Sequence, residues 1–245
     1  MQYTKKLHAE KLNFALMRPK SVLQQNYQRT AFLNALASEL NAVIGLYSKE
    51  LKRSGFYHEL LRRFRREPLN DRLLLLWQLR GMDINARYKL NKLGSHAFTV
   101  TEQKQQVLVN LQVLLHPKRG VHRADCHCYE IIVLTWTKNN QPATHNRQYS
   151  EWIDIKGEYP EFDFLFPKPA GTTHWLLCIK QQLGKEEQPV RAFVATGMQI
   201  AAIGSFDKKE QALLDEKLAP KKTAQGDGGK KVKDVVRVKA KRVVG

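Results

Sequence analysis

The chain has 245 residues, of which 42% are hydrophobic and 26% are charged. This balance excludes a collagen-like, a mucin-like or a wholly disordered chain, because such chains have too little apolar surface to bury. The 41 Lys and Arg residues outnumber the 23 Asp and Glu residues and leave a formal net charge of +18. A charge of this size indicates an anionic partner and says nothing about the fold.

Membrane and export signals are not expected in this sequence. The longest apolar run, at 73–77, is far shorter than the roughly 18 apolar residues of a membrane-spanning helix. The first twenty residues mix Lys and Arg with apolar residues and contain no apolar block followed by a cleavage site, so we expect no signal peptide. Three cysteines are an odd number and too few for a disulfide framework. We therefore predict a cytoplasmic protein with reduced thiols and no membrane span.

The positive charge is concentrated in two terminal segments. Residues 1–93 hold 18 Lys and Arg against 7 Asp and Glu, residues 94–218 hold 14 against 14, and residues 219–245 hold 9 against 2. The net charges are therefore +11, zero and +7. We predict three regions with these boundaries: a basic helical region, a neutral antiparallel β domain with a short closing helix, and a flexible basic tail of low complexity. Two basic ends indicate two contacts with a polyanion.

The first region is predicted to be a helical hairpin or a three-helix unit. Apolar residues spaced by three or four follow one face of a long first helix: Phe32, Leu36, Leu40, Val43, Tyr47 and Leu51. A short second helix begins at Phe56 and is interrupted by Pro68. A third helix, capped by Asn70 or Asp71 and weakened by Gly81, carries five apolar positions: Leu73, Leu74, Trp77, Met82 and Ile84.

From about His96 the apolar period changes from near 3.6 to 2, which is typical of strands. Strands are predicted at 107–115, 128–136, 151–155, 174–180, 190–196 and 198–203. Turn-forming residues separate them and no helical crossovers lie between them, which favours an antiparallel sheet or sandwich of about six strands. A helix at 207–218 is expected to close this domain. The predicted fold class is α+β.

The strongest candidate binding site in the first region is a group of arginines around Phe64: Arg62, Arg63, Arg65 and Arg66. At helical spacing Arg62 and Arg66 share a face and Arg63 lies beside it, so their guanidinium groups are placed to bind phosphates. Three more arginines recur at intervals of eight and seven on the next predicted helix: Arg72, Arg80 and Arg87. The alternative is a solvated helix face whose arginines pair with Glu59 and Glu67.

The tail carries the second candidate site, a run of cations that includes Lys230, Lys231, Lys233, Arg237, Lys239, Lys241 and Arg242. An extended segment of this composition binds phosphates by releasing counterions, without base specificity. No aromatic residue lies among these cations, which favours double-stranded or compact nucleic acid over a single strand as the partner of the tail. A solubilising extension and a contact with an acidic protein or lipid surface are the alternatives.

One cluster has the residue types of a metal site. His122, Cys126 and Cys128 are three potential zinc ligands, but one residue separates the two cysteines and no second ligand pair completes the site. In a strand the cysteines would share one face and His127 would take the other, so two small buried residues beside a surface histidine is the competing interpretation.

Motifs for catalysis are not found. The sequence has no glycine-rich nucleotide-binding motif, phosphate loop or nucleophile elbow. Five acidic residues between positions 151 and 163 are spaced irregularly, as in a solvated rim and unlike a nuclease metal site. We therefore predict no enzymatic activity, no cofactor and no catalytic residue.

Together these observations predict a nucleic-acid-binding protein that contacts phosphates through the helical arginines and the tail, with low sequence specificity. The sequence does not distinguish DNA from RNA. The alternative is a structural or assembly subunit, in a homo-oligomer or a larger protein assembly, whose long helix and basic tail pack against neighbouring proteins.

Overall fold

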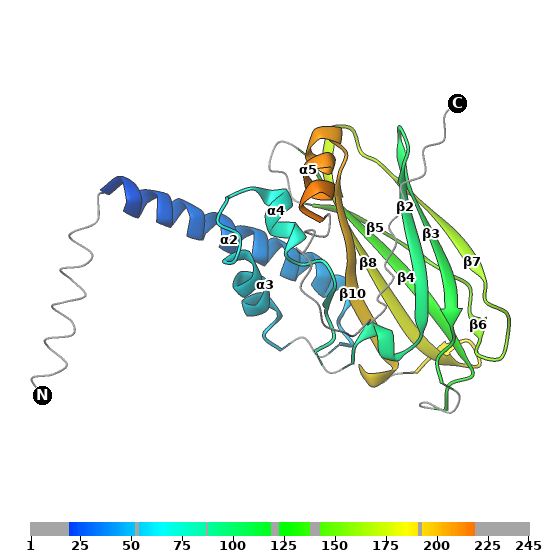
Figure 1. Cartoon of the computed structure of the whole chain (residues 1–245). Coiled ribbons are helices and arrows are strands. Elements are labelled where there is room, and N and C mark those ends of the chain that lie inside the picture. Colours follow the sequence, from blue (N-terminus) through cyan, green and yellow to red (C-terminus); the bar gives the residue numbers. More distant parts are fainter. Residues whose placement is uncertain are drawn as a thin grey trace, which may run out of the picture.

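The computed structural model of the chain describes residues 20–51, 54–86, 88–118, 123–137, 143–190 and 193–218. These residues form three layers: a group of helices, a seven-stranded sheet and a three-stranded sheet (Figure 1). The described strand pairs are antiparallel, which confirms the predicted α+β class. The seven-stranded sheet is the middle layer, because one hydrophobic cluster joins it to the helices and another joins it to the smaller sheet.

The middle sheet is built around two long strands, β4 (Cys126–Thr137) and β8 (Thr172–Lys185). Most of their residues are buried, because a layer covers each face. This double burial explains why both segments are rich in apolar residues at consecutive positions. The other strands of this sheet are β1 (Met82–Asp83), β5 (Thr144–Tyr149), β6 (Ile153–Asp154), β9 (Gln188–Pro189) and β10 (Thr196–Ser205). The strand order is β1-β10-β8-β4-β5, and β6 also pairs with β4 and β9 with β8.

The smaller sheet has the order β2-β3-β7 and consists of β2 (Ser95–Glu102), β3 (Gln106–Leu115) and β7 (Glu161–Pro167). Its central strand confirms the predicted alternation over 107–115. Every second side chain is buried against the middle sheet, namely Val107, Val109, Leu111 and Val113. The two sheets therefore form a sandwich with its own hydrophobic core.

Three helices cover the other face of the middle sheet: α2 (Lys20–Tyr47), α3 (Phe56–Phe64) and α4 (Arg72–Trp77). The predicted apolar stripe faces the core, with Leu36 and Leu40 fully buried. The first turns of α2, residues 21–28, are exposed and project beyond the other helices (Figure 1). None of the described helices combines the length and the apolar character that a membrane span requires.

The helices and the middle sheet share one hydrophobic cluster, which includes Leu40 and Phe64 from the helices and Ile132 and Leu176 from the sheet. A polar contact reinforces this packing. The carboxylate of Glu39 on α2 accepts hydrogen bonds from the indole nitrogen of buried Trp136 at 2.9 Å and from the backbone N–H of Ala143 at 2.5 Å. The core thus unites residues from the predicted 1–93 and 94–218 regions.

The predicted number of about six strands is wrong, because the described residues contain ten. Five strands are missing from the prediction: the two-residue strands β1 and β9, and the longer strands β2, β5 and β7, which lie at sheet edges. β5 is largely exposed and has no apolar alternation, so it depends on its hydrogen bonds to β4. The predicted strand at 190–196 is also wrong, since a 3-10 turn, η3 (Phe193–Ala195), precedes the start of β10.

The third predicted helix is too long. α4 ends at Trp77, and Gly81 then takes a left-handed backbone conformation with φ of 74°. The chain next pairs with β10: Met82 lies opposite Ile200, and the N–H of Ile84 donates to the carbonyl of Met198 at 2.7 Å. The predicted closing helix over 207–218 is confirmed as α5 (Lys208–Leu218).

Candidate nucleic-acid interface

The arginines around Phe64 do not all lie on one helix, contrary to the prediction: Arg62 and Arg63 form the last turn of α3, which ends at Phe64, and Arg65 and Arg66 lie in the turn that follows. The helix follows Gly55, whose left-handed φ of 79° makes glycine the favoured residue there. Its buried side chains are Phe56, Leu60, Leu61 and Phe64. Arg62 is exposed on the opposite face of the helix, and Arg65 and Arg66 are exposed in the turn after it.

Two of these arginines are bound to a carboxylate. Glu59 accepts a hydrogen bond from Nε of Arg62 at 2.6 Å and from Nε of Arg63 at 2.8 Å. The Arg62 contact is the main reason that the pKa of Glu59 is lowered to about 2. Arg63 also donates to the backbone carbonyl of Gln78 at 3.0 Å. For Arg62 and Arg63 the structure therefore shows the intramolecular pairing that the sequence offered as the alternative.

Arg65 and Arg66 differ from this pair, because neither forms an ion pair with another residue that the structure describes. Arg65 lines a groove of about 340 Å³ between α2 and α3, which we call the α2–α3 groove. The groove is lined by Asn26, Arg29, Thr30, Leu33, Asn34, Leu61 and Arg65, so it contains two guanidinium groups and no carboxylate. The guanidinium of Arg29 also donates to the backbone carbonyls of Glu67 and Pro68, which hold it in position.

The other predicted arginines do not form the expected row on one helix. Arg72 is half-buried at the start of α4, beside the capping residue Asp71. Arg80 lies beyond the end of α4 and its guanidinium is 5.0 Å from the ring centre of Trp77. Arg87, like the tail cations Lys230, Lys231, Lys233, Arg237, Lys239, Lys241 and Arg242, lies outside the described residues.

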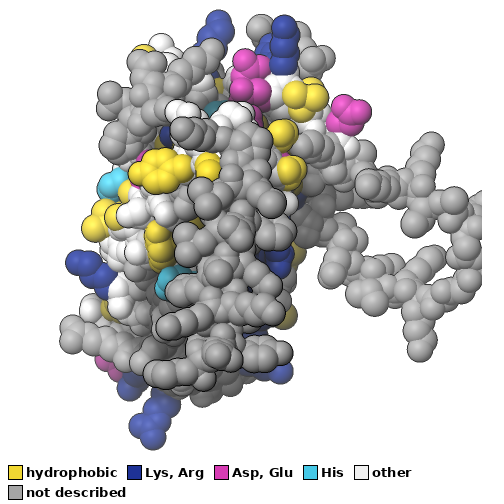
Figure 2. Space-filling view, turned by 90° about the vertical axis from the view of Figure 1, so that its left-hand side faces the viewer, with side chains coloured by type: hydrophobic (Ala, Val, Ile, Leu, Met, Phe, Trp, Pro, Cys, Tyr) yellow, Lys and Arg dark blue, Asp and Glu magenta, His cyan; other side chains and the backbone are white. Residues whose placement is uncertain are grey.

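The Lys and Arg side chains of the described residues are dispersed on this side of the molecule. Figure 2 shows that the coloured Lys and Arg side chains lie around the periphery of this side and do not gather in one dense patch. Hydrophobic and uncharged polar side chains lie between them.

The candidate metal ligands do not make a metal site within the described part of the chain. Cys126 and Cys128 are buried in β4, and burial raises their thiol pKa values to about 11 and about 12, which keeps both thiols protonated near neutral pH. His122 lies outside the described residues. No group of three His, Cys, Asp or Glu residues in the described ranges is arranged to hold a metal ion.

His127 is a fully buried residue, so the prediction of a surface histidine there is wrong. Its Nδ1 accepts a hydrogen bond from the side-chain amide of Gln181 at 3.1 Å, and its Nε2 lies 3.0 Å from Nδ1 of His116. Because the amide nitrogen only donates, the ring proton of His127 lies on Nε2 and is donated to His116. His116 in turn stacks on exposed Tyr159, with ring centres 4.5 Å apart.

The rings of His96, His116, His127, Tyr129 and Tyr159 form a histidine cluster. This cluster lies between the two sheets and contains no carboxylate among its described contacts. Tyr129 is flanked edge-on by the rings of His127 and His96, with centres 5.6 Å and 5.4 Å away. Burial lowers the pKa values of His96 and His127 to about 4, so both rings are neutral near pH 7. No local motif reveals the cluster in the sequence, because its members come from three separate strands and the segments between them.

The opposite face of the same sheet carries a buried ion network. The ammonium of Lys180 contacts the carboxylates of Glu50 and Glu130, the latter at 2.9 Å, and donates to the backbone carbonyl of Tyr47 at 3.0 Å. Arg147 lies 3.6 Å from the second carboxylate oxygen of Glu130. Glu130 and Lys180 are only 5% and 6% exposed, so these pairings are needed to offset the loss of hydration. The network ties the C-terminal end of α2 to β4, β5 and β8.

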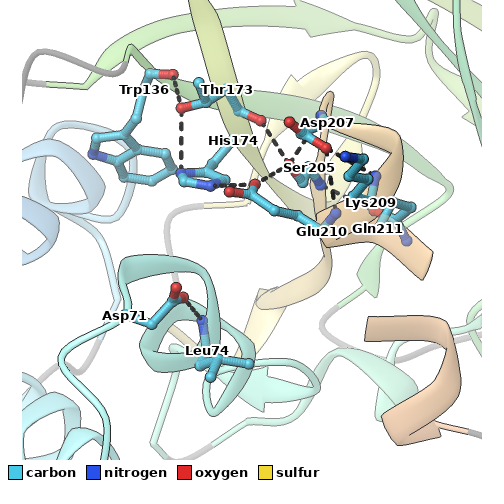
Figure 3. A network of polar contacts seen from close by, with 10 residues as sticks. All are labelled: Asp71, Leu74, Trp136, Thr173, His174, Ser205, Asp207, Lys209, Glu210 and Gln211. Atoms are coloured by element: carbon cyan, nitrogen blue, oxygen red, sulfur yellow. Dashed lines mark hydrogen bonds and ion pairs between the residues drawn. The ribbon is translucent and has the colours of Figure 1, made fainter. Parts of the chain in front are cut away.

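A third polar group includes a serine, a histidine and a glutamate (Figure 3). Ser205 donates to the carboxylate of Glu210 at 2.5 Å, and Nε2 of His174 contacts the same oxygen at 3.0 Å. Both side chains are thus directed to Glu210, and in this arrangement the imidazole does not accept the serine proton as nucleophilic catalysis requires. Ser205 lies on β10 and His174 on β8, so the network attaches α5 to these two strands of the middle sheet.

Comparison of the sequence with protein-family models and with curated proteins found no match. The fold defines an α+β protein with a two-sheet sandwich and a helical layer. Function is therefore inferred from the side chains described above, chiefly the exposed arginines in the turn after α3 and the α2–α3 groove.

Proposed function

We propose that this protein binds nucleic acid through its phosphates, at the surface formed by α2 and α3, with low sequence specificity. The observation that carries the proposal is the α2–α3 groove, in which Arg29 and Arg65 face a space without a carboxylate. Arg66 follows Arg65 in the turn after α3 and is exposed. Guanidinium groups bind phosphate oxygens through paired hydrogen bonds, and the charge of the phosphate adds to their strength.

The acidic residues of the helices support this proposal, because most of them are engaged elsewhere. Glu39 binds Trp136 and Ala143, and Glu50 binds Lys180. Asp71 accepts the N–H of Leu74 at the start of α4, and Glu67 is only 8% exposed. The positive charge of Arg65 and Arg66 is consequently left uncompensated by these carboxylates.

The tail is proposed as a second contact with the same polyanion. Its cations would add affinity by releasing counterions, whatever the base sequence. Affinity that depends on phosphates falls steeply with salt, because the logarithm of the binding constant decreases by about 0.9 per neutralised phosphate for each tenfold rise in salt. Salt dependence is thus the signature of the proposed mechanism.

The test uses fluorescence anisotropy of a labelled duplex DNA and a labelled RNA hairpin, between about 50 and 200 mM salt. We expect the full chain to bind both and the Arg65→Gln/Arg66→Gln variant to bind at least tenfold more weakly, since two charge-assisted contacts are lost. Lys104→Gln/Lys156→Gln is the matched control, because it removes two exposed cations far along the chain in the β domain. An affinity that is insensitive to salt would refute the proposal. So would an Arg65→Gln/Arg66→Gln variant that binds as tightly as the Lys104→Gln/Lys156→Gln control.

A second candidate function, that of an assembly subunit, is favoured by the exposed apolar side chains of the first turns of α2. Val22 and Leu23 are 39% and 40% exposed, and Tyr27 is 76% exposed. Exposed apolar side chains on a projecting helix suit a contact with a neighbouring protein. Light scattering in high salt after nuclease treatment separates the two functions: a stable homo-oligomer favours assembly, and a monomer favours the nucleic-acid binder.

A further inference from the structure

The wall of the α2–α3 groove continues toward the N-terminal end of α2. Leu23, Tyr27, Thr30 and Asn34 follow one another at spacings of four, three and four residues, so they lie on one side of the helix. Thr30 and Asn34 line the groove. Tyr27 lies about 4.5 Å further along the helix axis than Thr30, and it therefore extends the same wall by one turn.

Tyr27 is available to a ligand. Its side chain is 76% exposed, the largest value among the large hydrophobic residues that the structure shows as exposed. Leu23 is its one exposed apolar neighbour on the same side of α2, and polar, uncharged residues surround the two: Gln24, Gln25, Asn26 and Gln28. Many protein-binding helices present apolar anchors at positions i, i+3, i+4 and i+7, whereas counted from Leu23 the last three of these positions are Asn26, Tyr27 and Thr30.

The groove itself combines three kinds of chemistry. Its floor is apolar, formed by Leu33 and Leu61, which are 4% and 8% exposed. The side-chain amides of Asn26 and Asn34 offer both donors and acceptors, and the Thr30 hydroxyl donates to the carbonyl of Asn26 at 2.8 Å. Arg29 and Arg65 supply the positive charge.

We propose that the α2–α3 groove binds one unpaired nucleotide, with its phosphate on Arg29 and Arg65 and its base stacked on Tyr27. The amides of Asn26 and Asn34 lie on the same wall, where they meet the polar edge of the base. The volume of about 340 Å³ is in the range of small-ligand sites. This inference rests on the proposed function and narrows it to nucleic acid with unpaired bases, such as single strands and loops.

Duplex nucleic acid does not offer the same contacts. Its base faces are covered by their stacked neighbours, and only base edges are reached from the grooves. A single strand or a loop exposes a base face, and aromatic side chains bind that face with little dependence on base identity. The helical groove and the basic tail would therefore recognise different features of one nucleic acid: an unpaired base and the phosphate backbone.

The test compares a single-stranded RNA with the duplex of the same sequence as ligands of the full chain and of Tyr27 variants. We expect Tyr27→Ala to weaken single-strand binding roughly 5- to 100-fold, the loss of one base–aromatic stack. Tyr27→Phe should retain the affinity, because the ring remains. The matched control is Tyr149→Ala, which removes another exposed tyrosine, on β5. Duplex affinity should be unchanged in all three variants.

Failure of this inference is distinct from failure of the proposed function. If Tyr27→Ala binds the single strand normally while Arg65→Gln/Arg66→Gln does not, phosphate binding stands and the nucleotide site is wrong. If salt and the arginine variant have no effect on any ligand, both proposals are wrong. If Tyr27→Ala alters only the oligomeric state in light scattering, Tyr27 contacts a protein and the nucleotide site is overturned.

Discussion

The two faces of the middle sheet handle buried polar groups in opposite ways. Tyr129 and Glu130 are neighbours on β4, and Lys180 and Gln181 are neighbours on β8, yet each pair is divided between the two faces. On the helix side Glu130 and Lys180 are charged and paired at 2.9 Å. On the sandwich side Gln181 and His127 form a neutral hydrogen bond, without a countercharge among the described contacts. The comparison shows two ways to bury polar side chains: a charged group is paired with an opposite charge, and a group without such a partner is buried in its neutral, hydrogen-bonded form.

The largest loss of stability is expected when Lys180 is removed from the ion network on the helix side. Lys180→Met removes the closer of the two cations that pair with buried Glu130 and leaves Arg147 at 3.6 Å, and we expect the free energy of unfolding to fall by about 3–5 kcal/mol. Urea denaturation measures the loss. Adding Glu130→Gln should recover part of it, because the uncompensated charge is then removed. Lys185→Met, which removes an exposed pair with Glu186, should cost less than about 1 kcal/mol.

The buried histidines on the sandwich side of the middle sheet predict that the stability of the protein depends on pH. His96 and His127 have pKa values of about 4 in the folded protein, below the value of about 6.5 of an unfolded histidine. Between these values the unfolded chain binds more protons, so stability is present above pH 6.5 and decreases as the pH falls toward 4. Each histidine contributes up to about 1.4 kcal/mol per pH unit in this window.

Urea denaturation at pH 7 and pH 5 measures this dependence. His127→Gln should flatten it, since one titrating ring is removed. His58→Gln replaces an exposed histidine of α3 and should leave it unchanged. The lowered pKa of Glu59 acts in a separate window, with its stability lost only as the pH falls from about 4.5 toward 2. A stability that rises on acidification from pH 7 to pH 5 would contradict the neutral state of the cluster.

The smallest effects are expected at the solvent-exposed rims of the two faces. Tyr159→Ala removes the ring that stacks on His116 and should cost about 1 kcal/mol beyond the loss of buried area. Tyr149→Ala removes a cation–π contact with Arg147 on the charged side and should cost about 0.5 to 1 kcal/mol. Chemical denaturation of both variants makes the comparison. A loss at either rim that equals the loss in Lys180→Met would show that the rims carry the stability.

Hydrophobic spacing was sufficient to predict the elements that pack against a neighbouring layer. The stripe of α2, the alternation of β3 and the apolar run of β4 each follow from which side of the element is covered. Strand β5 could not be predicted in this way, because it is a polar edge strand that is held by hydrogen bonds to β4 and has no hydrophobic alternation of its own. The same holds for β1, whose pairing with β10 overrides the helical period around Met82.

The site was predictable only in part, for a related reason. Arg65 and Arg66 could be singled out from local charge, whereas Arg29 joins them only because α2 and α3 pack side by side. The pairing of Arg62 and Arg63 with Glu59 is a local contact at helical spacing and was foreseen as an alternative. The histidine cluster and the ion network depend on strand register, which brings residues from distant segments together and leaves no local signal.

Helix α2 runs without interruption from the groove to the buried ion network. Asn26 and Thr30 lie near one end, and at the other the carbonyl of Tyr47 accepts the ammonium hydrogen bond of Lys180. The helix rises about 1.5 Å per residue, so some 25 Å of continuous rod separates the two. A force that tilts the exposed first turns of α2 would be transmitted along the helix to Lys180, so the buried ion pairs would resist movement of a ligand bound at the groove.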